Sequence, residues 1–109
     1  MSDVIVGGGG LIGMLTAREL AAAGAAVTLV ERGALGREAS WAGGGILSPL
    51  YPWRYPDAVN ALSGWSQGDF PRLAAELVEE TGIDPEWTRS GLLVLEPCDE
   101  EIHAWARRW

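Results

Sequence analysis

Residues 3–13 read Asp3-Val4-Ile5-Val6-Gly7-Gly8-Gly9-Gly10-Leu11-Ile12-Gly13, an apolar run that leads into a series of glycines. Three of them, Gly8, Gly10 and Gly13, match the spacing G-x-G-x-x-G. In this pattern the first glycine allows a tight turn, the second lets the backbone approach a phosphate, and the third lets a helix pack closely on a strand. The stretch therefore predicts a strand, a phosphate-binding loop and the start of a helix.

The residues that follow complete a β-α-β pattern. Ala17, Leu20 and Gly24 recur at steps of three or four, so they share one face of a predicted helix that can lie on a sheet. Gly24 is placed to end that helix. Residues 27–30, Val-Thr-Leu-Val, are apolar and β-branched enough for a buried parallel strand.

Glu31 follows the second strand, 18 residues beyond Gly13. In dinucleotide-binding folds an acid at this place hydrogen-bonds the hydroxyl groups of the adenosine ribose. Because a carboxylate disfavours a 2′-phosphate, the pattern favours NAD or FAD over NADP. An unrelated glycine-rich turn is the alternative, but it does not account for two strands, a helix and an acid in register.

These elements predict an α/β fold, a Rossmann-like dinucleotide-binding βαβ unit with a parallel sheet over residues 1–50. Residues 51–109 are expected to form a helical segment and the first strand of a substrate domain. The small size supports this division, because 109 residues are too few for most dinucleotide enzymes with a second domain. We therefore expect the N-terminal part of a longer enzyme.

The second half of the chain has helical periodicity. Two amphipathic helices are expected after Asp57, the second with Asp69 as its N-cap, Pro71 in its first turn and Gly82 as its stop. Residues 91–95, Gly-Leu-Leu-Val-Leu, predict a short strand of a different sheet. A last helix is expected from residue 99 onward, with an apolar stripe that comprises Ile102, Trp105, Ala106 and Trp109.

Between these halves, residues 32–56 lose all periodicity and are rich in small side chains, among them Ala42-Gly43-Gly44-Gly45-Ile46. A loop this long in a compact unit is usually functional. Consecutive glycines let the backbone lie against a flat group such as a flavin ring. A solvated linker is the alternative, and the apolar residues Trp41, Ile46 and Leu47 argue against it.

Charge and composition narrow the function classes. With 15 acidic and 8 basic residues the net charge is −7, so neither nucleic acid nor an anionic membrane surface is an expected partner. No run of 18 apolar residues is present that could span a bilayer. Cys98 is the only cysteine and can form no intrachain disulfide, which is typical of a cytoplasmic protein.

No metal-ligand cluster and no nucleophile–base pair is visible in the sequence, so a hydrolase or a metalloenzyme has no support. Arg54 is the only local arginine that could orient a carboxylate, and a surface role suits it better. His103 is interpreted as a solvated helix residue. No catalytic residue is therefore assigned.

Several stretches together resemble the FAD-dependent glycine oxidase and D-amino acid oxidase family, in particular its glycine oxidases of thiamine biosynthesis. The stretches are Gly8-Gly9-Gly10-Leu11-Ile12-Gly13, Glu31-Arg32-Gly33, Ala39-Ser40-Trp41-Ala42-Gly43-Gly44-Gly45-Ile46-Leu47-Ser48-Pro49 and Ser90-Gly91-Leu92-Leu93. The first is shared by many flavoproteins. The third, followed by Leu50-Tyr51-Pro52-Trp53-Arg54-Tyr55, is much more specific.

The resemblance implies FAD as cofactor and assigns residues to it. The pyrophosphate would lie on Leu11 and Ile12, and the adenosine ribose on Glu31, with Arg32 beside it. Ala39 and Ser40 would contact the cofactor. The isoalloxazine ring would lie against Gly44, Gly45 and Ile46, with Ser48 and Tyr51 nearer the substrate entrance.

The implied reaction is the oxidation of a small amino acid or amine, with a hydride passing to flavin N5, hydrolysis of the imine, and reoxidation by O2 to hydrogen peroxide. The arginine that would hold the substrate carboxylate, and a second flavin-binding stretch, are expected beyond residue 109. Two alternatives remain open: another flavin enzyme of the family, such as a D-amino-acid dehydrogenase, and a truncated nucleotide-binding remnant. A homo-oligomer is conceivable for the full-length enzyme.

Overall fold

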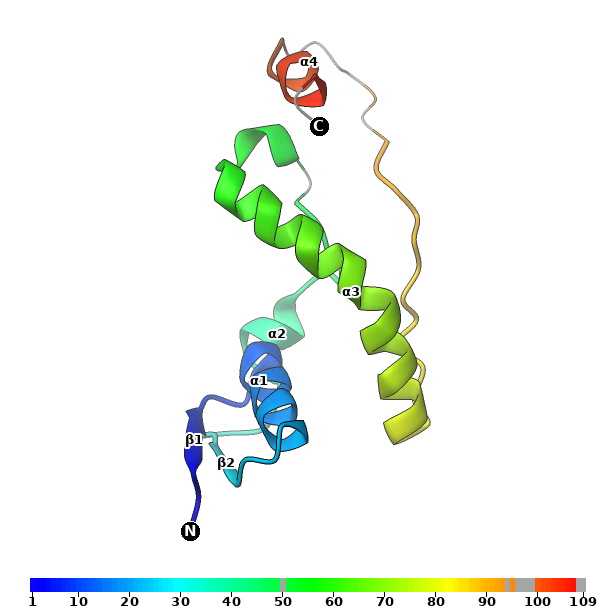
Figure 1. Cartoon of the computed structure of the whole chain (residues 1–109). Coiled ribbons are helices and arrows are strands. Elements are labelled where there is room, and N and C mark those ends of the chain that lie inside the picture. Colours follow the sequence, from blue (N-terminus) through cyan, green and yellow to red (C-terminus); the bar gives the residue numbers. More distant parts are fainter. Residues whose placement is uncertain (50, 94, 96–99, 108–109) are drawn as a thin grey trace. The chain divides into compact units, whose positions relative to one another are not determined.

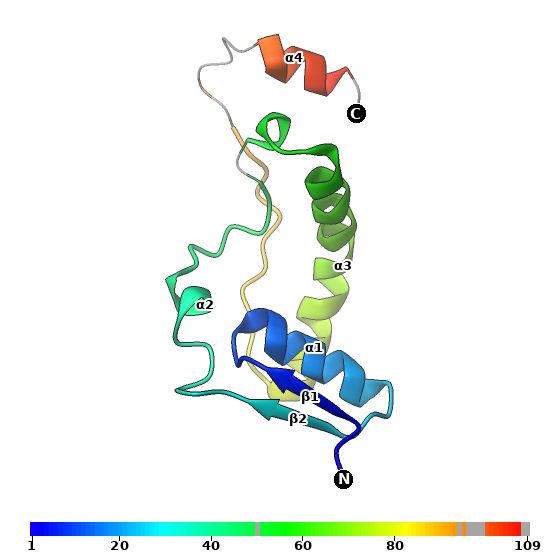
Figure 2. The same ribbon diagram turned by 90° about the vertical axis from the view of Figure 1, so that its left-hand side faces the viewer.

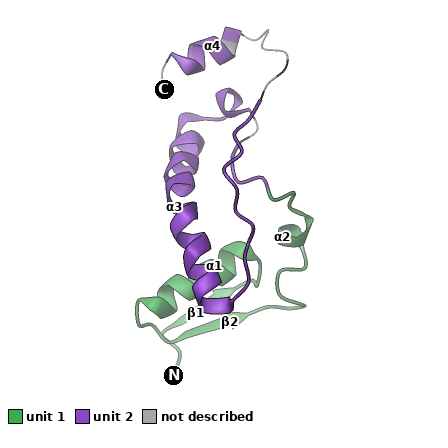
Figure 3. Cartoon of the chain, turned by 90° about the vertical axis from the view of Figure 1, so that its right-hand side faces the viewer, with its two compact units in different colours: residues 1–45 green, residues 46–109 purple. Residues whose placement is uncertain are grey.

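The computed structural model describes residues 1–49, 51–93, 95 and 100–107. Figure 1 shows its elements in chain order. The chain divides into two compact units, residues 1–45 and residues 46–109, which Figure 3 distinguishes by colour. The domain assignment made from the sequence stays a prediction. Cys98, Asp99 and Trp109, which the sequence analysis singled out, lie outside the described residues.

The first unit begins with the expected β-α-β arrangement. Strand β1 (Val4–Gly7) is followed by helix α1 (Leu11–Ala22) and strand β2 (Val27–Val30). The two strands are parallel, with Val4 opposite Val27 and Gly7 opposite Val30. Figure 2 shows α1 lying over one face of this two-stranded sheet. The predicted Rossmann-like start of the fold is confirmed.

Half-buried and exposed residues alternate along both strands, and this alternation shows which face α1 covers. Val6 and Leu29 belong to the half-buried set, whereas Ile5 and Val30 keep 70% and 53% of their surface exposed on the other face. Successive strand residues point to opposite faces, so one face of each strand meets the helix. Among the described residues no apolar side chain is fully buried.

Gly24 ends α1 as the sequence predicted. Its φ of 93° lies in the left-handed region, which costs glycine no side-chain clash. Its N–H donates to Ala21 O at 2.9 Å, and Ala25 N–H donates to Leu20 O at 3.0 Å. This pair of bonds is the Schellman motif, and it turns the chain directly into β2.

The segment between β2 and the second unit was predicted to be a loop and contains one further element. Helix α2 (Ala39–Ala42) is a single turn whose first carbonyl, that of Glu38, accepts bonds from Trp41 N–H and Ala42 N–H at 3.1 and 3.2 Å. The guanidinium of Arg37 lies 4.1 Å from the ring centroid of Trp41. The turn brings residues 38–42 into a defined conformation.

The second unit contains the 3-10 turn η1 (Pro52–Arg54), the long helix α3 (Asp57–Thr81) and helix α4 (Glu100–Ala106). In the described part of this unit, the buried polar side chain is that of Asn60 on α3. It has 8% of its surface exposed, and its amide donates to Pro52 O at 2.8 Å. The last predicted helix is confirmed over the residues of α4. No helix in the described ranges is long and apolar enough to cross a bilayer.

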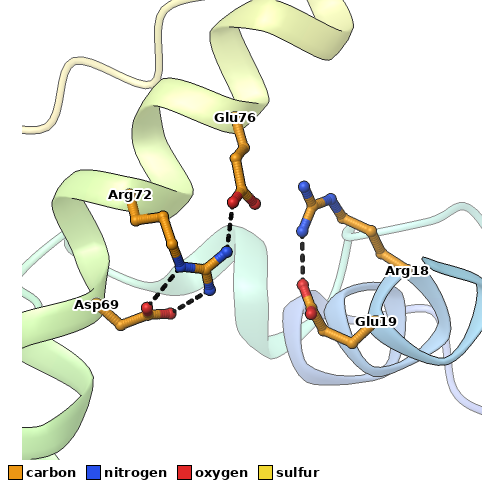
Figure 4. A network of polar contacts seen from close by, with 5 residues as sticks. All are labelled: Arg18, Glu19, Asp69, Arg72 and Glu76. Atoms are coloured by element: carbon orange, nitrogen blue, oxygen red, sulfur yellow. Dashed lines mark hydrogen bonds and ion pairs between the residues drawn. The ribbon is translucent and has the colours of Figure 1, made fainter. Parts of the chain in front are cut away.

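The prediction of two separate helices after Asp57 is wrong, because α3 continues through Pro71. A proline inside a helix removes one N–H and crowds the carbonyl four residues earlier. Here Arg72 bridges the site: it donates to both carboxylate oxygens of Asp69 at 2.8 Å and pairs with Glu76 one turn later (Figure 4). Asp69 is therefore an ion-pair partner inside the helix and not an N-cap.

Two further expectations concern the second unit, the helix stop at Gly82 and the strand at residues 91–95. Gly82 ends α3 in the left-handed conformation, with φ 71°, and its N–H donates to Val78 O at 2.8 Å, so its role as helix stop is confirmed. The strand predicted at 91–95 is not formed at residues 91–93 and 95, and Val94 lies outside the description. A strand needs a hydrogen-bonded neighbour, and the described part of this unit offers none.

Candidate dinucleotide-binding site

The glycine loop between β1 and α1 has the tight turn and the close helix contact that its G-x-G-x-x-G spacing predicts. Gly8 has a φ of 107°, and its N–H extends the sheet ladder by donating to Val30 O at 2.8 Å. A Cβ placed on Gly13 would lie 1.9 Å from Gly8 O. The helix therefore begins in direct contact with the turn, and only glycine fits at position 13.

Gly9 is constrained as well, although the motif leaves its position unrestricted. It is buried, its N–H donates to Glu31 Oε2 at 2.7 Å, and its carbonyl accepts from Gly36 N–H at 2.8 Å. An added Cβ would meet Leu35 Cδ2 at 2.4 Å and Glu31 Cβ at 3.0 Å. Sequence reasoning missed this residue because its constraints come from a segment more than twenty positions away.

Glu31 lies directly after β2 and uses both carboxylate oxygens. Oε2 accepts from Gly9 N–H, and Oε1 accepts from Gly33 N–H at 2.9 Å. These two backbone donors, Gly9 first, lower the pKa of the Glu31 carboxyl below its ordinary value. The side chain is therefore an ionised, fixed acceptor at the end of the strand. Its remaining lone pairs are available to ribose hydroxyls.

The loop geometry leads to a pH prediction. Because the pKa of Glu31 is depressed by folding, its anchor on Gly9 and Gly33 is complete above the ordinary carboxyl value of 4.5 and is lost as the pH falls through the lowered value. We expect the amide proton resonances of Gly9 and Gly33 to shift together in an NMR titration, with a midpoint below 4.5. Glu31→Gln should remove this transition, and a midpoint at or above the ordinary value would contradict the assignment.

Ser40 brings the second segment against the glycine loop. Its hydroxyl accepts a hydrogen bond from Leu11 N–H, the first amide of α1, at 2.8 Å. The same oxygen lies 3.1 Å from the position that a Cβ on Gly10 would take. The first residues of a helix have unpaired N–H groups, which attract anions or oxygen acceptors. Ser40 thus lies at the N-terminal end of α1, where the sequence predicts the phosphate.

The remaining candidate residues are placed less closely. Arg32 is exposed and pairs with Glu38. Gly44 and Gly45 are exposed, and a Cβ on either would meet nothing within 4 Å. Ile46 begins the second unit and is 62% exposed. Of the predicted ligands, the structure brings Glu31 and Ser40 into hydrogen-bond contact with the loop that holds Gly8, Gly10, Leu11, Ile12 and Gly13, with Ala39 next to Ser40. Contact of any of them with a cofactor stays a prediction.

The described residues contain no group of three or more His, Cys, Asp or Glu side chains that could hold a metal ion. What the first unit offers is a helix N-terminus, a loop without side chains and a fixed carboxylate. This arrangement is suited to a pyrophosphate next to a ribose, the shared part of NAD and FAD.

A family model for FAD-dependent oxidoreductases, the DAO family, matches residues 3–109. The chain belongs to this family. The match confirms the resemblance found in the sequence and decides between the two dinucleotides in favour of FAD. The residues present fit the adenosine diphosphate part of FAD, because a glycine loop at the N-terminus of α1 and an ionised carboxylate at the end of β2 lie in hydrogen-bond contact with each other.

Curated relatives show which members of the DAO family are similar to this chain. A glycine oxidase of Pseudomonas aeruginosa is 61% identical over 106 residues, which are 96% of this chain and 29% of that protein. A glycine oxidase of Pseudomonas putida is 55% identical over 97% of this chain and 29% of its own length. A D-amino acid dehydrogenase 2 of Ralstonia nicotianae is 36% identical over 91% of this chain and 23% of its own.

The chain thus spans 29% of the length of the two Pseudomonas relatives. No solved structure matches it.

Proposed function

We propose that this chain forms the adenosine-binding part of an FAD-dependent amino-acid oxidase of the glycine oxidase type. The observation that carries the proposal is the convergence of the glycine loop, Glu31 and Ser40 on the N-terminal end of α1. The high identity to two glycine oxidases supports the substrate class, a small amino acid or amine.

In this proposal, different residues contact different parts of the cofactor. The backbone at the start of α1 lies along the pyrophosphate, with Leu11 and Ile12 nearest, and Glu31 accepts hydrogen bonds from the adenosine ribose, with Arg32 beside it. Ser40 and Ala39 close the loop from the other side. Gly44, Gly45 and Ile46 offer backbone to the isoalloxazine ring. The bound flavin supplies the hydride acceptor for the oxidation.

The overall reaction converts glycine, water and O2 into glyoxylate, ammonia and hydrogen peroxide. The electron pair of the C–H bond leaves the substrate for O2, and water replaces the amino group. The groups that hold the amino acid are proposed to lie beyond residue 109.

The test has two stages. The purified chain is mixed with FAD and desalted, and flavin absorption that stays with the protein supports the adenosine site. The intact enzyme that carries this chain is then assayed for peroxide with glycine as the substrate. Glycine-dependent peroxide is the expected result. Absence of retained flavin from both proteins would refute the proposal.

A dehydrogenase is the second candidate, because the Ralstonia relative with that name is also similar over most of the chain. Such an enzyme would pass electrons to an acceptor other than O2. Amino-acid oxidation with an artificial electron acceptor, without matching peroxide, would favour it. A remnant that binds nucleotide without activity would retain flavin and oxidise nothing.

A further inference from the structure

Two arginines, Arg32 and Arg37, follow β2. Arg32 is at a position where a cation can affect whether a dinucleotide with a 2′-phosphate is bound. In dinucleotide-binding folds the acid after the second strand binds the ribose hydroxyls, and an arginine nearby accommodates a 2′-phosphate where the cofactor carries one. Arg32 directly follows Glu31. By position alone, the loop therefore carries both the group that rejects a 2′-phosphate and a group that could accept it.

Glu38 holds this arginine. Its Oε1 accepts from Arg32 Nη2 at 2.5 Å and from Arg32 Nε at 3.2 Å. Both side chains are exposed, at 81% for Arg32 and 67% for Glu38, and most ion pairs of this kind contribute little to stability. The effect of the Arg32–Glu38 pair that concerns ligand binding is therefore its effect on the charge near Glu31.

The two ends of this pair are fixed by the backbone around them. Glu31, next to Arg32, is anchored on Gly9 and Gly33. Glu38 caps α2 through its carbonyl, and two residues later Ser40 is bonded to Leu11. The segment 32–38 thus closes between two anchored points, so forming the ion pair costs little chain entropy.

We propose that Glu38 is a specificity-determining residue, which excludes dinucleotides with a 2′-phosphate by neutralising Arg32. The inference rests on the proposed function, since it places the adenosine ribose at Glu31. The three side chains Glu31, Arg32 and Glu38 carry a net charge of −1, which repels a phosphate dianion, whereas Glu31 and Arg32 alone would carry none. Arg37, the other cation of the segment, lies over the Trp41 ring.

The experiment compares two ligands that differ only in the 2′-phosphate, ADP-ribose and 2′-phospho-ADP-ribose, by calorimetric titration of the chain. Glu38→Gln should raise the affinity for the phosphorylated ligand about fivefold relative to ADP-ribose, as expected for one exposed charge contact. Affinity for ADP-ribose itself should stay within about twofold. Adding Arg32→Gln to this variant should abolish the gain.

Glu19→Gln is the matched control, because it removes the same charge from an ion pair within α1, that of Arg18 and Glu19. An equal gain in this variant would show a general charge effect and overturn the inference. A gain that survives Arg32→Gln would assign the phosphate to another cation and also overturn it. If Glu31→Ala leaves ADP-ribose binding unchanged, or neither ligand binds, the proposed function itself fails.

Discussion

Replacing Gly13 with alanine is expected to destroy the nucleotide site and to unfold the β1–α1–β2 unit at room temperature. The new Cβ would lie 1.9 Å from Gly8 O and 3.0 Å from Gly8 C, so it would collide with backbone. Gly8 cannot retreat, because its N–H is bonded to Val30 O. Overpacking of this kind costs about 3 kcal/mol or more, a large part of the stability of a small domain.

The measurement is an NMR amide spectrum of the chain together with its FAD affinity. Loss of dispersed resonances from residues 4–30 and loss of flavin binding are expected together. Gly7→Ala is the matched control: it lies in the same unit, has no positive φ, and its Cβ would meet nothing within 4 Å. Equal damage from both substitutions, or a folded Gly13→Ala chain, would contradict this reading of the loop.

Glu31→Ala is expected to lower FAD affinity by roughly ten- to a hundredfold. The substitution removes the acceptor of Gly9 N–H and Gly33 N–H, and it also removes the proposed ribose ligand. Glu31→Gln should be nearly as damaging, because the carboxamide can accept at only one oxygen and would turn its NH2 toward the second backbone donor.

Fluorescence quenching of FAD by the chain gives the affinity, and the amide resonances of Gly9 and Gly33 report the loop. Glu79→Ala, at an exposed position of α3, is the control for loss of one negative charge. Unchanged FAD affinity in Glu31→Ala would remove the ribose assignment. Weaker binding with unmoved Gly9 and Gly33 resonances would contradict the anchoring role alone.

Local pattern was enough to predict the first unit. The glycine spacing, the helix stop at Gly24 and the acid after β2 depend on neighbours within a few residues, and each appears where the sequence placed it. The family resemblance was readable for the same reason, because its stretches are contiguous. Periodicity also predicted the helix stop at Gly82.

Contacts between distant segments could not be predicted. The bond from Gly9 to Glu31 and that from Leu11 to Ser40 join positions 22 and 29 residues apart, and nothing in the sequence specifies either pairing. The helix start expected at Asp69, with Pro71 in its first turn, was wrong because α3 runs through both residues, and Arg72 pairs with Asp69 and Glu76 inside the helix. The strand expected at 91–95 needed a partner that no local pattern supplies.

The parallel pairing of β1 with β2 has a consequence for biosynthesis. The strands are joined by one helix, and every bond that ties Glu31 and Ser40 to the glycine loop lies within residues 1–45. The proposed adenosine-binding loop can therefore form once residues 1–45 have left the ribosome, without waiting for release of the rest of the chain.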